Sequence, residues 1–171
     1  MSKIIIRREN YTDEKDIYDI YHNAFPTDDE AQVVEYLCQQ EESYSAWVAE
    51  YGKYVVAHIL YTKLKIAGFE DLTDVYGLAP MAVLPQYQGK GIGSVLVLES
   101  LKELKGIGAK AVFVLGHKDF YPRFGFRKAI KQGFYYKDIK FSESFFLLEL
   151  NPNYLKGASA EVIYKPVFDN L

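Results

Sequence analysis

The 171-residue chain contains few of the residues that form disulfides and metal centres. Its single cysteine, Cys38, excludes an internal disulfide and a cysteine-based metal cluster. Its three histidines lie far apart in the sequence and show no metal-ligand spacing: His22, His58 and His117. We therefore expect no bound metal, and a protein of a reducing compartment, the cytoplasm.

Long hydrophobic runs are also missing, although 49% of the residues are hydrophobic. No apolar segment approaches the roughly 20 residues that span a bilayer, so we expect no membrane partner. The apolar stretch near the start, Ile4-Ile5-Ile6, is too short for a secretory signal and is typical of a first strand. The length and composition suit one full hydrophobic core, and we expect a single domain over residues 1–171.

An excess of basic charge is the third absence, because the net charge is −3. A nucleic-acid-binding domain is normally basic, so we expect no nucleic-acid partner. The charge is unevenly distributed: residues 9–50 hold twelve Asp or Glu and one Lys, whereas residues 101–140 hold ten Lys or Arg and three acids. This split suits a polyanionic ligand on one half and a cationic ligand on the other. Solvated helix faces that merely differ in sign would give the same pattern.

Hydrophobic periodicity predicts a mixed α/β order of elements. Strands are expected over residues 3–9, 46–51, 53–66, 74–84, 109–115, 133–136, 144–150 and 160–165. Helices are expected over residues 13–25, 28–38 and 92–107, the first of them capped by Thr12. Within residues 116–126 we expect one helical turn, capped by Asp119 and closed by Gly125.

The most informative segment lies between an apolar strand and an apolar helix, and reads Gln86-Tyr87-Gln88-Gly89-Lys90-Gly91-Ile92-Gly93-Ser94. A turn from a strand into a helix exposes backbone N–H groups at the positive end of the helix dipole, which is a ready anion site. Three glycines remove the side chains that would keep a phosphate away from this backbone. The segment therefore predicts a ligand that carries phosphate.

Three phosphate-binding motifs can be compared with this segment. A Walker A loop is excluded, because Gly89-Lys90 is followed by Gly91 instead of Ser or Thr. The dinucleotide fingerprint fits poorly, because Ser94 stands at its third glycine and residues 110–116 carry no carboxylate. The pattern Gln/Arg-x-x-Gly-x-Gly/Ala is matched in full by Gln88, Gly91 and Gly93. A glycine-rich turn without a ligand remains the alternative.

Through this third pattern the chain resembles the GNAT-type N-acetyltransferases, whose loop of this kind holds the pyrophosphate of acetyl-CoA. The match includes the preceding Met81-Ala82-Val83-Leu84-Pro85 and the amphipathic helix that follows. The resemblance implies the GNAT fold, an α/β (α+β) arrangement with a mixed central sheet and helices on both faces. Residues 115–126 and 145–150 further resemble the YhbS-like branch of predicted bacterial acetyltransferases, which implies a reaction type but no acceptor.

The resemblance implies acetyl-CoA as the co-substrate and a set of cofactor-binding residues. Backbone groups of Met81, Ala82 and Val83 would pair with the pantetheine arm like an added strand. One of these N–H groups would also serve as a donor to the thioester oxygen. The pyrophosphate would be surrounded by Gln88, Gly89, Lys90, Gly91, Ile92, Gly93 and Ser94.

Tyr121 is the first candidate for a catalytic side chain. It lies four residues before Gly125, where family members carry the tyrosine that protonates the coenzyme A thiolate. A phenol of pKa about 10 is a suitable proton donor to a thiolate whose thiol has a pKa of about 8.5. With 15 tyrosines in the chain, a packing role for any one of them is the competing interpretation.

The general base is not defined by the sequence. Family members often carry a glutamate six residues before the position of Val83, and here that position is Gly77. His117, after the strand over 109–115, and Glu50, on a neighbouring strand, are the two candidates. His117 has the intrinsic pKa range of a base, but a histidine bonded to the loop backbone would look the same in the sequence.

The first functional hypothesis is an acetyl-CoA-dependent N-acetyltransferase acting on an amine of a small molecule or peptide. Transfer would be direct within a ternary complex, because Cys38 falls in phase with Val34 on a helix and is expected to be buried and inert. The acidic residues of 9–50 favour a cationic acceptor, and exposed late strands would permit a homodimer.

Two other functional classes compete with this one. A non-catalytic regulator that binds acyl-CoA is the main alternative, supported by the missing carboxylate at Gly77. A nucleotide phosphotransferase would need a Walker lysine and magnesium-binding carboxylates, and neither has an evident position.

Overall fold

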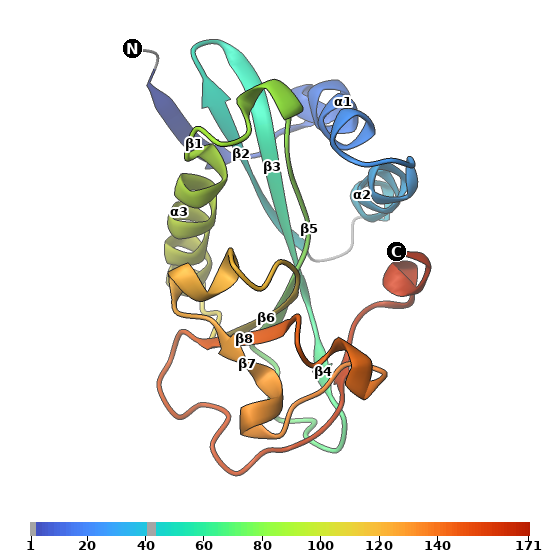
Figure 1. Ribbon diagram of the computed structural model, residues 1–171, viewed down its shortest axis with the longest axis vertical. Helices are drawn as coiled ribbons and strands as arrows, with labels where there is room; N and C mark the ends of the chain where they lie inside the picture. Colours follow the sequence, from blue (N-terminus) through green and yellow to red (C-terminus); the bar gives the residue numbers. More distant parts are fainter. Residues whose placement is uncertain (1–2, 41–43) are drawn as a thin grey trace. The chain divides into compact units, whose positions relative to one another are not determined.

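The computed structural model describes residues 3–40 and 44–171 (Figure 1). The chain divides into two compact units. The first unit comprises Met1–Tyr61, Pro80–Glu103 and Val167–Leu171, and the second comprises Thr62–Ala79 and Leu104–Pro166.

The first unit is built on the strands β1 (Ile4–Arg8), β2 (Tyr44–Tyr51) and most of β3 (Tyr54–Lys63). β1 and β2 are antiparallel, with a register from Ile4↔Tyr51 to Arg8↔Trp47. The turn between β2 and β3 has Gly52 at φ 71°, a left-handed conformation that glycine adopts without strain. The predicted hairpin over residues 46–66 is therefore confirmed, and β3 ends at Lys63.

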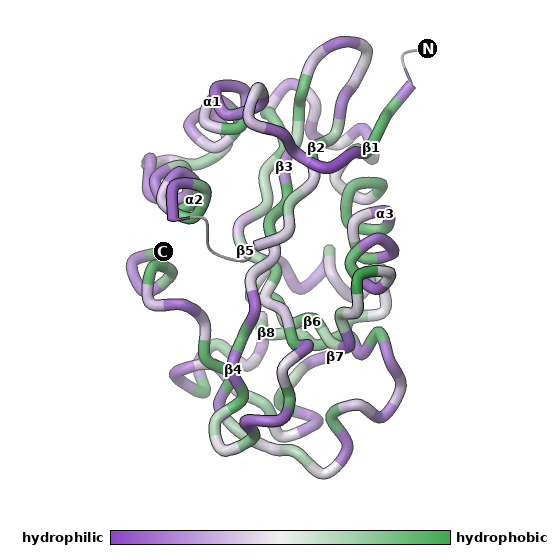
Figure 2. Tube along the Cα trace, turned by 180° about the vertical axis from the view of Figure 1, so that it is seen from behind, coloured by the Kyte–Doolittle hydropathy of each residue, from purple (hydrophilic) through white to green (hydrophobic). Residues whose placement is uncertain are grey.

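Three helices cover this part of the sheet. The helices α1 (Glu14–Ala24) and α2 (Asp29–Gln39) lie on one side and α3 (Ile92–Gly106) lies on the other, which is visible in both views (Figures 1 and 2). α1 buries Ile17, Ile20 and Tyr21, whereas the hydrophilic stretches of α1 and α2 are visible in Figure 2. The expected helices on both faces of the sheet are thus observed.

The N-terminal cap of the first helical segment differs from the prediction. A 3-10 turn over Tyr11–Asp13 precedes α1, and Asn10 stands at its N-cap position instead of Thr12. The Asn10 side chain accepts the N–H of Thr12, and the Asp13 carboxylate accepts the N–H of Asn10. This reciprocal capping box satisfies two N–H groups that Thr12 alone would leave unpaired.

The second unit contains strands β6 (Ala111–Leu115), β7 (Arg127–Lys128) and β8 (Phe145–Glu149). β6 runs parallel to the first residues of β5 (Val75–Val83), and β8 pairs antiparallel with both β6 and β7. A separate two-stranded sheet joins β4 (Lys65–Ile66) and β9 (Val162–Ile163). The expected strand over 160–165 is therefore confirmed only in its centre.

The strand predicted over residues 133–136 is wrong. A 3-10 turn over Ala129–Gln132 ends at Gly133, whose φ is 82° and whose N–H donates to the carbonyls of Ala129 and Ile130. This turn-closing geometry is incompatible with an extended backbone. Only an isolated bridge between Tyr135 and Glu161 remains of the expected strand.

The main sheet has seven strands in the order β1-β2-β3-β5-β6-β8-β7. The sheet is mixed, because β5 and β6 are parallel while the β1–β2, β6–β8 and β7–β8 pairs are antiparallel. This is the α/β fold class that the sequence predicts. β3, β5 and α3 each pass from one unit into the other.

Candidate functional site

The glycine-rich turn of the first unit connects β5 to α3. A short 3-10 turn over Pro85–Tyr87 follows β5, and α3 begins at Ile92. Gly89 and Gly91 adopt φ values of 73° and 80°, which cost other L-residues about 1–2 kcal/mol. A Cβ added at either glycine would meet no heavy atom within 4 Å, so open space lies beside this backbone.

The first turn of α3 has the properties of an anion site. The Val95 N–H donates to the Gly91 carbonyl at 3.1 Å, which makes Gly91 the residue that opens the helix. The N–H groups of Ile92 and Gly93 belong to the first turn, which has no intrahelical acceptors. The first turn carries no acidic residue, and Lys90 directly before it is exposed. The dipole of this 15-residue helix adds a positive end to the same point.

Gln88 ties the turn to the end of β5. Its side-chain Nε2 donates to the Val83 carbonyl at 2.9 Å. The side chain thereby supports the turn, which leaves the backbone of residues 88–94 as the part that a phosphate group would approach.

The backbone of β5 beyond its first half is the second element of the site. The register with β6 pairs Val75–Leu78 with Ala111–Val114 and ends there, whereas β5 continues to Val83. Pro80 lies within this continuation and has no N–H to donate. Along this edge the ladder between β5 and β6 therefore stops before Met81, Ala82 and Val83, which is the geometry that accepts an extended ligand as an added strand.

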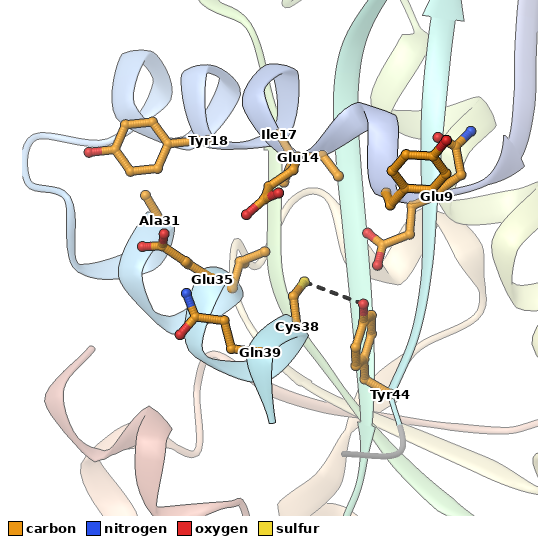
Figure 3. A pocket seen from close by; sticks show the side chains of 12 residues that line it. Glu9, Glu14, Ile17, Tyr18, Ala31, Glu35, Cys38, Gln39 and Tyr44 are labelled. Atoms are coloured by element: carbon orange, nitrogen blue, oxygen red, sulfur yellow. Dashed lines mark hydrogen bonds between the residues drawn. The ribbon is translucent and has the colours of Figure 1, made fainter. Parts of the chain in front are cut away.

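A cavity of about 400 Å³ lies in the first unit, among the segment after β1, α1, α2 and the start of β2 (Figure 3). Three carboxylates and three aromatic rings line it: Glu9, Glu14, Glu35, Tyr11, Tyr18 and Tyr44. None of its lining residues in the described part of the chain is basic. Three of the twelve acidic residues of 9–50 thus line one cavity.

Cys38 lines this cavity and is half-buried, so its expected burial in the core is wrong. The Tyr44 hydroxyl donates to its Sγ at 3.3 Å (Figure 3). Burial raises the pKa of the Cys38 thiol, which keeps it in the less nucleophilic protonated form. The low reactivity expected of Cys38 therefore still holds, but its reason is the raised pKa of the thiol and not burial in the core.

Glu50 belongs to an ion-pair network between β1 and β2. Its Oε1 accepts the Arg7 Nε–H at 2.7 Å. The same guanidinium holds the buried Asp13 with two further hydrogen bonds of 2.7 and 2.8 Å. One cation is therefore shared by two carboxylates, Glu50 and Asp13, and the Arg7 hydrogen bond lowers the pKa of Asp13.

Tyr121 is buried in the second unit, at the start of a 3-10 turn over Tyr121–Phe124. Its ring lies against Gly116, where an added Cβ would come within 2.3 Å of Tyr121 Cε2. The rings of Phe120 and Phe126 pack against it edge-on. Burial raises the pKa of the Tyr121 hydroxyl, which therefore stays protonated at neutral pH.

The turn that holds Tyr121 closes as predicted but begins differently. Gly125 ends it at φ 92°, with its N–H on the Pro122 carbonyl. Phe120, and not Asp119, occupies the N-cap position, and no side chain caps the turn. The cause is a preceding turn in which the His117 carbonyl accepts the N–H of Phe120, so that Asp119 lies inside that turn. His117 itself is exposed.

The structure thus brings the predicted residues together in two groups. Met81–Val83, the turn over 88–94 and Glu50 belong to the first unit, and His117 and Tyr121 share one turn of the second unit.

The packing around Gly77 explains why glycine, and not glutamate, stands at this position. A Cβ at Gly77 would lie 2.5 Å from Tyr164 Cε1 and 2.9 Å from Leu64 Cδ2. The Tyr164 hydroxyl donates to the Phe113 carbonyl at 3.2 Å, which fixes the ring over the glycine. The tail of the chain therefore occupies the space that a side chain at position 77 would need.

We expect Gly77→Ala to destabilise the fold by about 1–3 kcal/mol, because overpacking forces Tyr164 from its position. Urea unfolding at equilibrium would measure this change. Gly106→Ala is the matched control, since a Cβ there meets nothing within 4 Å and alanine favours the helix. An equal response of both variants would contradict the packing of Tyr164 on Gly77.

The first unit contains a buried series of hydrogen-bonded polar groups that the sequence does not predict. The Tyr21 hydroxyl donates to the Pro80 carbonyl at 3.1 Å and lies 2.8 Å from His58 Nδ1. His58 Nε2 lies 2.7 Å from Glu9 Oε2. Tyr21 and His58 are fully buried. These four residues lie 12 or more positions apart in the sequence, so no local motif indicates that they interact. The sequence gives one indication, a histidine inside an apolar strand.

Known proteins are similar to this chain. The model of the acetyltransferase (GNAT) family matches residues 14–126, which include β5, the glycine turn and Tyr121. The chain belongs to the GNAT acetyltransferase family. This GNAT chain is 38% identical over 117 residues to the uncharacterized N-acetyltransferase YjhQ of Escherichia coli K12, covering 67% of this chain and 65% of YjhQ. It is 34% identical over 128 residues to the uncharacterized N-acetyltransferase YhbS of the same strain, covering 74% and 75%.

Solved structures agree with this assignment. The YhbS N-acetyltransferase of Escherichia coli in complex with CoA superposes with a TM-score of 0.91 at 29% identity, covering 98% of this chain and 93% of that one. A GNAT acetyltransferase of Brucella melitensis in complex with acetyl-CoA has a TM-score of 0.80 at 29% identity, covering 99% and 100%. The resemblance of the sequence to the YhbS-like branch is therefore confirmed.

No group of three or more His, Cys, Asp or Glu side chains in the described residues is arranged to hold a metal ion. No helix of this part of the chain has the length and apolar character to cross a membrane.

Proposed function

We propose that this GNAT protein is an acetyl-CoA-dependent N-acetyltransferase that moves the acetyl group directly to an amine in a ternary complex. The observation that carries the proposal is the open, left-handed glycine turn between β5 and the N-terminus of α3. The CoA and acetyl-CoA complexes of the two similar structures support the same ligand class. We further propose that residues 1–171 act as one domain, in the cytoplasm.

In this proposal the cofactor is held mainly by backbone groups. The pyrophosphate lies on the N–H groups of residues 88–94, where the helix dipole and Lys90 favour negative charge. The pantetheine arm continues the sheet along Met81–Val83, where the β5–β6 ladder has ended. The Met81 N–H then points at the thioester oxygen and stabilises the negative charge of the tetrahedral intermediate.

Tyr121 acts as the general acid. Its hydroxyl is protonated at neutral pH, as that of an ordinary tyrosine is, so a proton is available when the thiolate leaves. As the C–S bond breaks, the electron pair stays on sulfur and the Tyr121 proton is transferred to it. The phenolate is then reprotonated from solvent.

The attacking amine must lose a proton, and His117 and Glu50 remain the candidates for the base. His117 is exposed and shares a turn with Tyr121, which supports its role. Glu50 Oε1 already accepts a hydrogen bond from Arg7, so this oxygen is not free to accept a proton from an amine. We therefore rank His117 first, acting directly or through a water molecule.

The acceptor is proposed to be cationic. The acidic and aromatic cavity of the first unit offers carboxylates and tyrosine faces to an organic ammonium group. A part of the acceptor that carries a second amine would bind there while another amine reacts.

One experiment separates these proposals from their rivals. Release of coenzyme A thiol is measured with acetyl-CoA and a panel of cationic, neutral and anionic amines, together with binding of acetyl-CoA and of ATP by calorimetry. We expect binding of acetyl-CoA but not ATP, and the highest kcat/KM with cationic amines. Tight binding without turnover on any amine would favour a non-catalytic regulator. Turnover confined to neutral or anionic amines would contradict the cationic acceptor.

A further inference from the structure

The buried chain Glu9–His58–Tyr21–Pro80 links the acidic cavity to β5. Glu9 lines the cavity, His58 is fully buried in β3, and Tyr21 is fully buried in α1. Pro80 lies one residue before Met81 on β5. All four residues belong to the first unit.

The proton count of the Glu9–His58 pair sets the direction of the Tyr21 hydroxyl. The Tyr21 hydroxyl has one proton, and both the Pro80 carbonyl at 3.1 Å and His58 Nδ1 at 2.8 Å lie within its reach. The carbonyl can only accept, so Tyr21 donates to it when His58 Nδ1 carries a proton. Because Nε2 donates to Glu9 at 2.7 Å, this state is an imidazolium beside a carboxylate. When the pair loses one proton, Nδ1 becomes an acceptor and Tyr21 turns to it.

A hydrogen bond to the Pro80 carbonyl affects the Met81 N–H. The Pro80 carbonyl and the Met81 N–H belong to the same peptide group. A hydrogen bond accepted by the carbonyl polarises that group and strengthens its N–H as a donor, by about 10–30% per bond.

We propose that Tyr21, His58 and Glu9 are positioning residues that hold and polarise the Pro80–Met81 peptide for acetyl transfer. This inference rests on the proposed function, in which the Met81 N–H stabilises the oxyanion. The network acts when the Glu9–His58 pair holds its extra proton, and it weakens as that proton is lost.

Titratable groups from three neighbouring segments interact electrostatically with the pair: Asp13 in the turn before α1, Tyr44 on β2 and Cys38 on α2. Arg7 of β1 in turn bonds Asp13 and Glu50. Glu14 of α1 and Glu35 of α2 interact with Cys38. Burial opposes ionisation of Glu9, but hydrogen bonding to His58, with a smaller contribution from Tyr44, outweighs it and lowers the pKa of Glu9.

The test compares Tyr21→Phe with Tyr61→Phe in acetyl transfer. Tyr61 is also fully buried in the first unit, and its hydroxyl bonds Ser100 Oγ at 2.8 Å, away from Pro80. We expect Tyr21→Phe to lower kcat about threefold to fivefold with little change in the KM for acetyl-CoA, and Tyr61→Phe to leave both within about twofold. Glu9→Gln should match Tyr21→Phe, and the double variant should lose nothing more.

A second readout does not depend on activity. Nitrogen-15 NMR of the His58 imidazole, assigned by its loss in His58→Gln, should show a protonated Nδ1 in the wild type and an unprotonated Nδ1 in Glu9→Gln. An unprotonated Nδ1 at all pH values, or equal kcat for Tyr21→Phe and Tyr61→Phe, would overturn the inference. Absence of turnover in the wild type would instead refute the proposed function, while the NMR would still decide which way Tyr21 donates.

Discussion

Tyr121→Phe should lower kcat about 100-fold while acetyl-CoA binds as tightly as to the wild type, because the variant lacks only the proton donor to the leaving thiolate. Phenylalanine keeps the ring that packs on Gly116 and against Phe120 and Phe126. The loss should therefore appear in turnover and not in folding. Single-turnover measurement of thiol release, with binding measured by calorimetry, separates the two.

Tyr164→Phe is the matched control for this experiment. Tyr164 is also buried in the second unit, but its hydroxyl already donates to the Phe113 carbonyl. We expect its removal to cost about 1 kcal/mol of stability and to leave kcat within about threefold. If Tyr164→Phe slowed the reaction as much as Tyr121→Phe, the effect would be structural and Tyr121 would lose its role as the acid.

Gly91→Asp should weaken acetyl-CoA binding about 30-fold, because it places a carboxylate beside the pyrophosphate. A repulsion of about 2 kcal/mol corresponds to that factor at the partly screened surface. Asp tolerates the left-handed conformation of Gly91 better than most residues, and a Cβ there meets no protein atom. The fold should therefore survive, and calorimetry should show the loss in affinity directly.

Two variants separate charge from backbone strain. Gly91→Asn has the same shape without the charge and should lose less affinity than Gly91→Asp. Gly68→Asp places the same residue at the same φ of 80° in an equally open turn after β4, and should leave affinity within about twofold. Equal weakening by Asp at both positions would mean that the turn over 88–94 does not hold the pyrophosphate.

Local patterns gave reliable predictions where local physics decides the structure. The glycine turn, the start of α3 at Ile92 and the closure of the 121–124 turn by Gly125 all depend on left-handed glycines and helix termini within a few residues. The wrong predictions also came from local patterns. Residues 133–136 read as a strand because of their aromatic residues, yet Gly133 closes a turn. Asp119 read as a cap, yet a preceding turn at His117 includes it.

The sequence by itself determined the mixed α/β order, the GNAT family and the spacing of the phosphate-binding turn, because each follows from neighbouring residues or from short periodicity. Only the tertiary structure decided what surrounds the chemistry. Tyr164 covers Gly77 from 87 positions away in the chain, Arg7 engages Glu50, and Tyr21 joins His58 to Pro80. These contacts join residues distant in sequence, and burial makes each polar partner costly to lose. No local pattern records such pairs, since they exist only once the sheet has brought its strands and helices together.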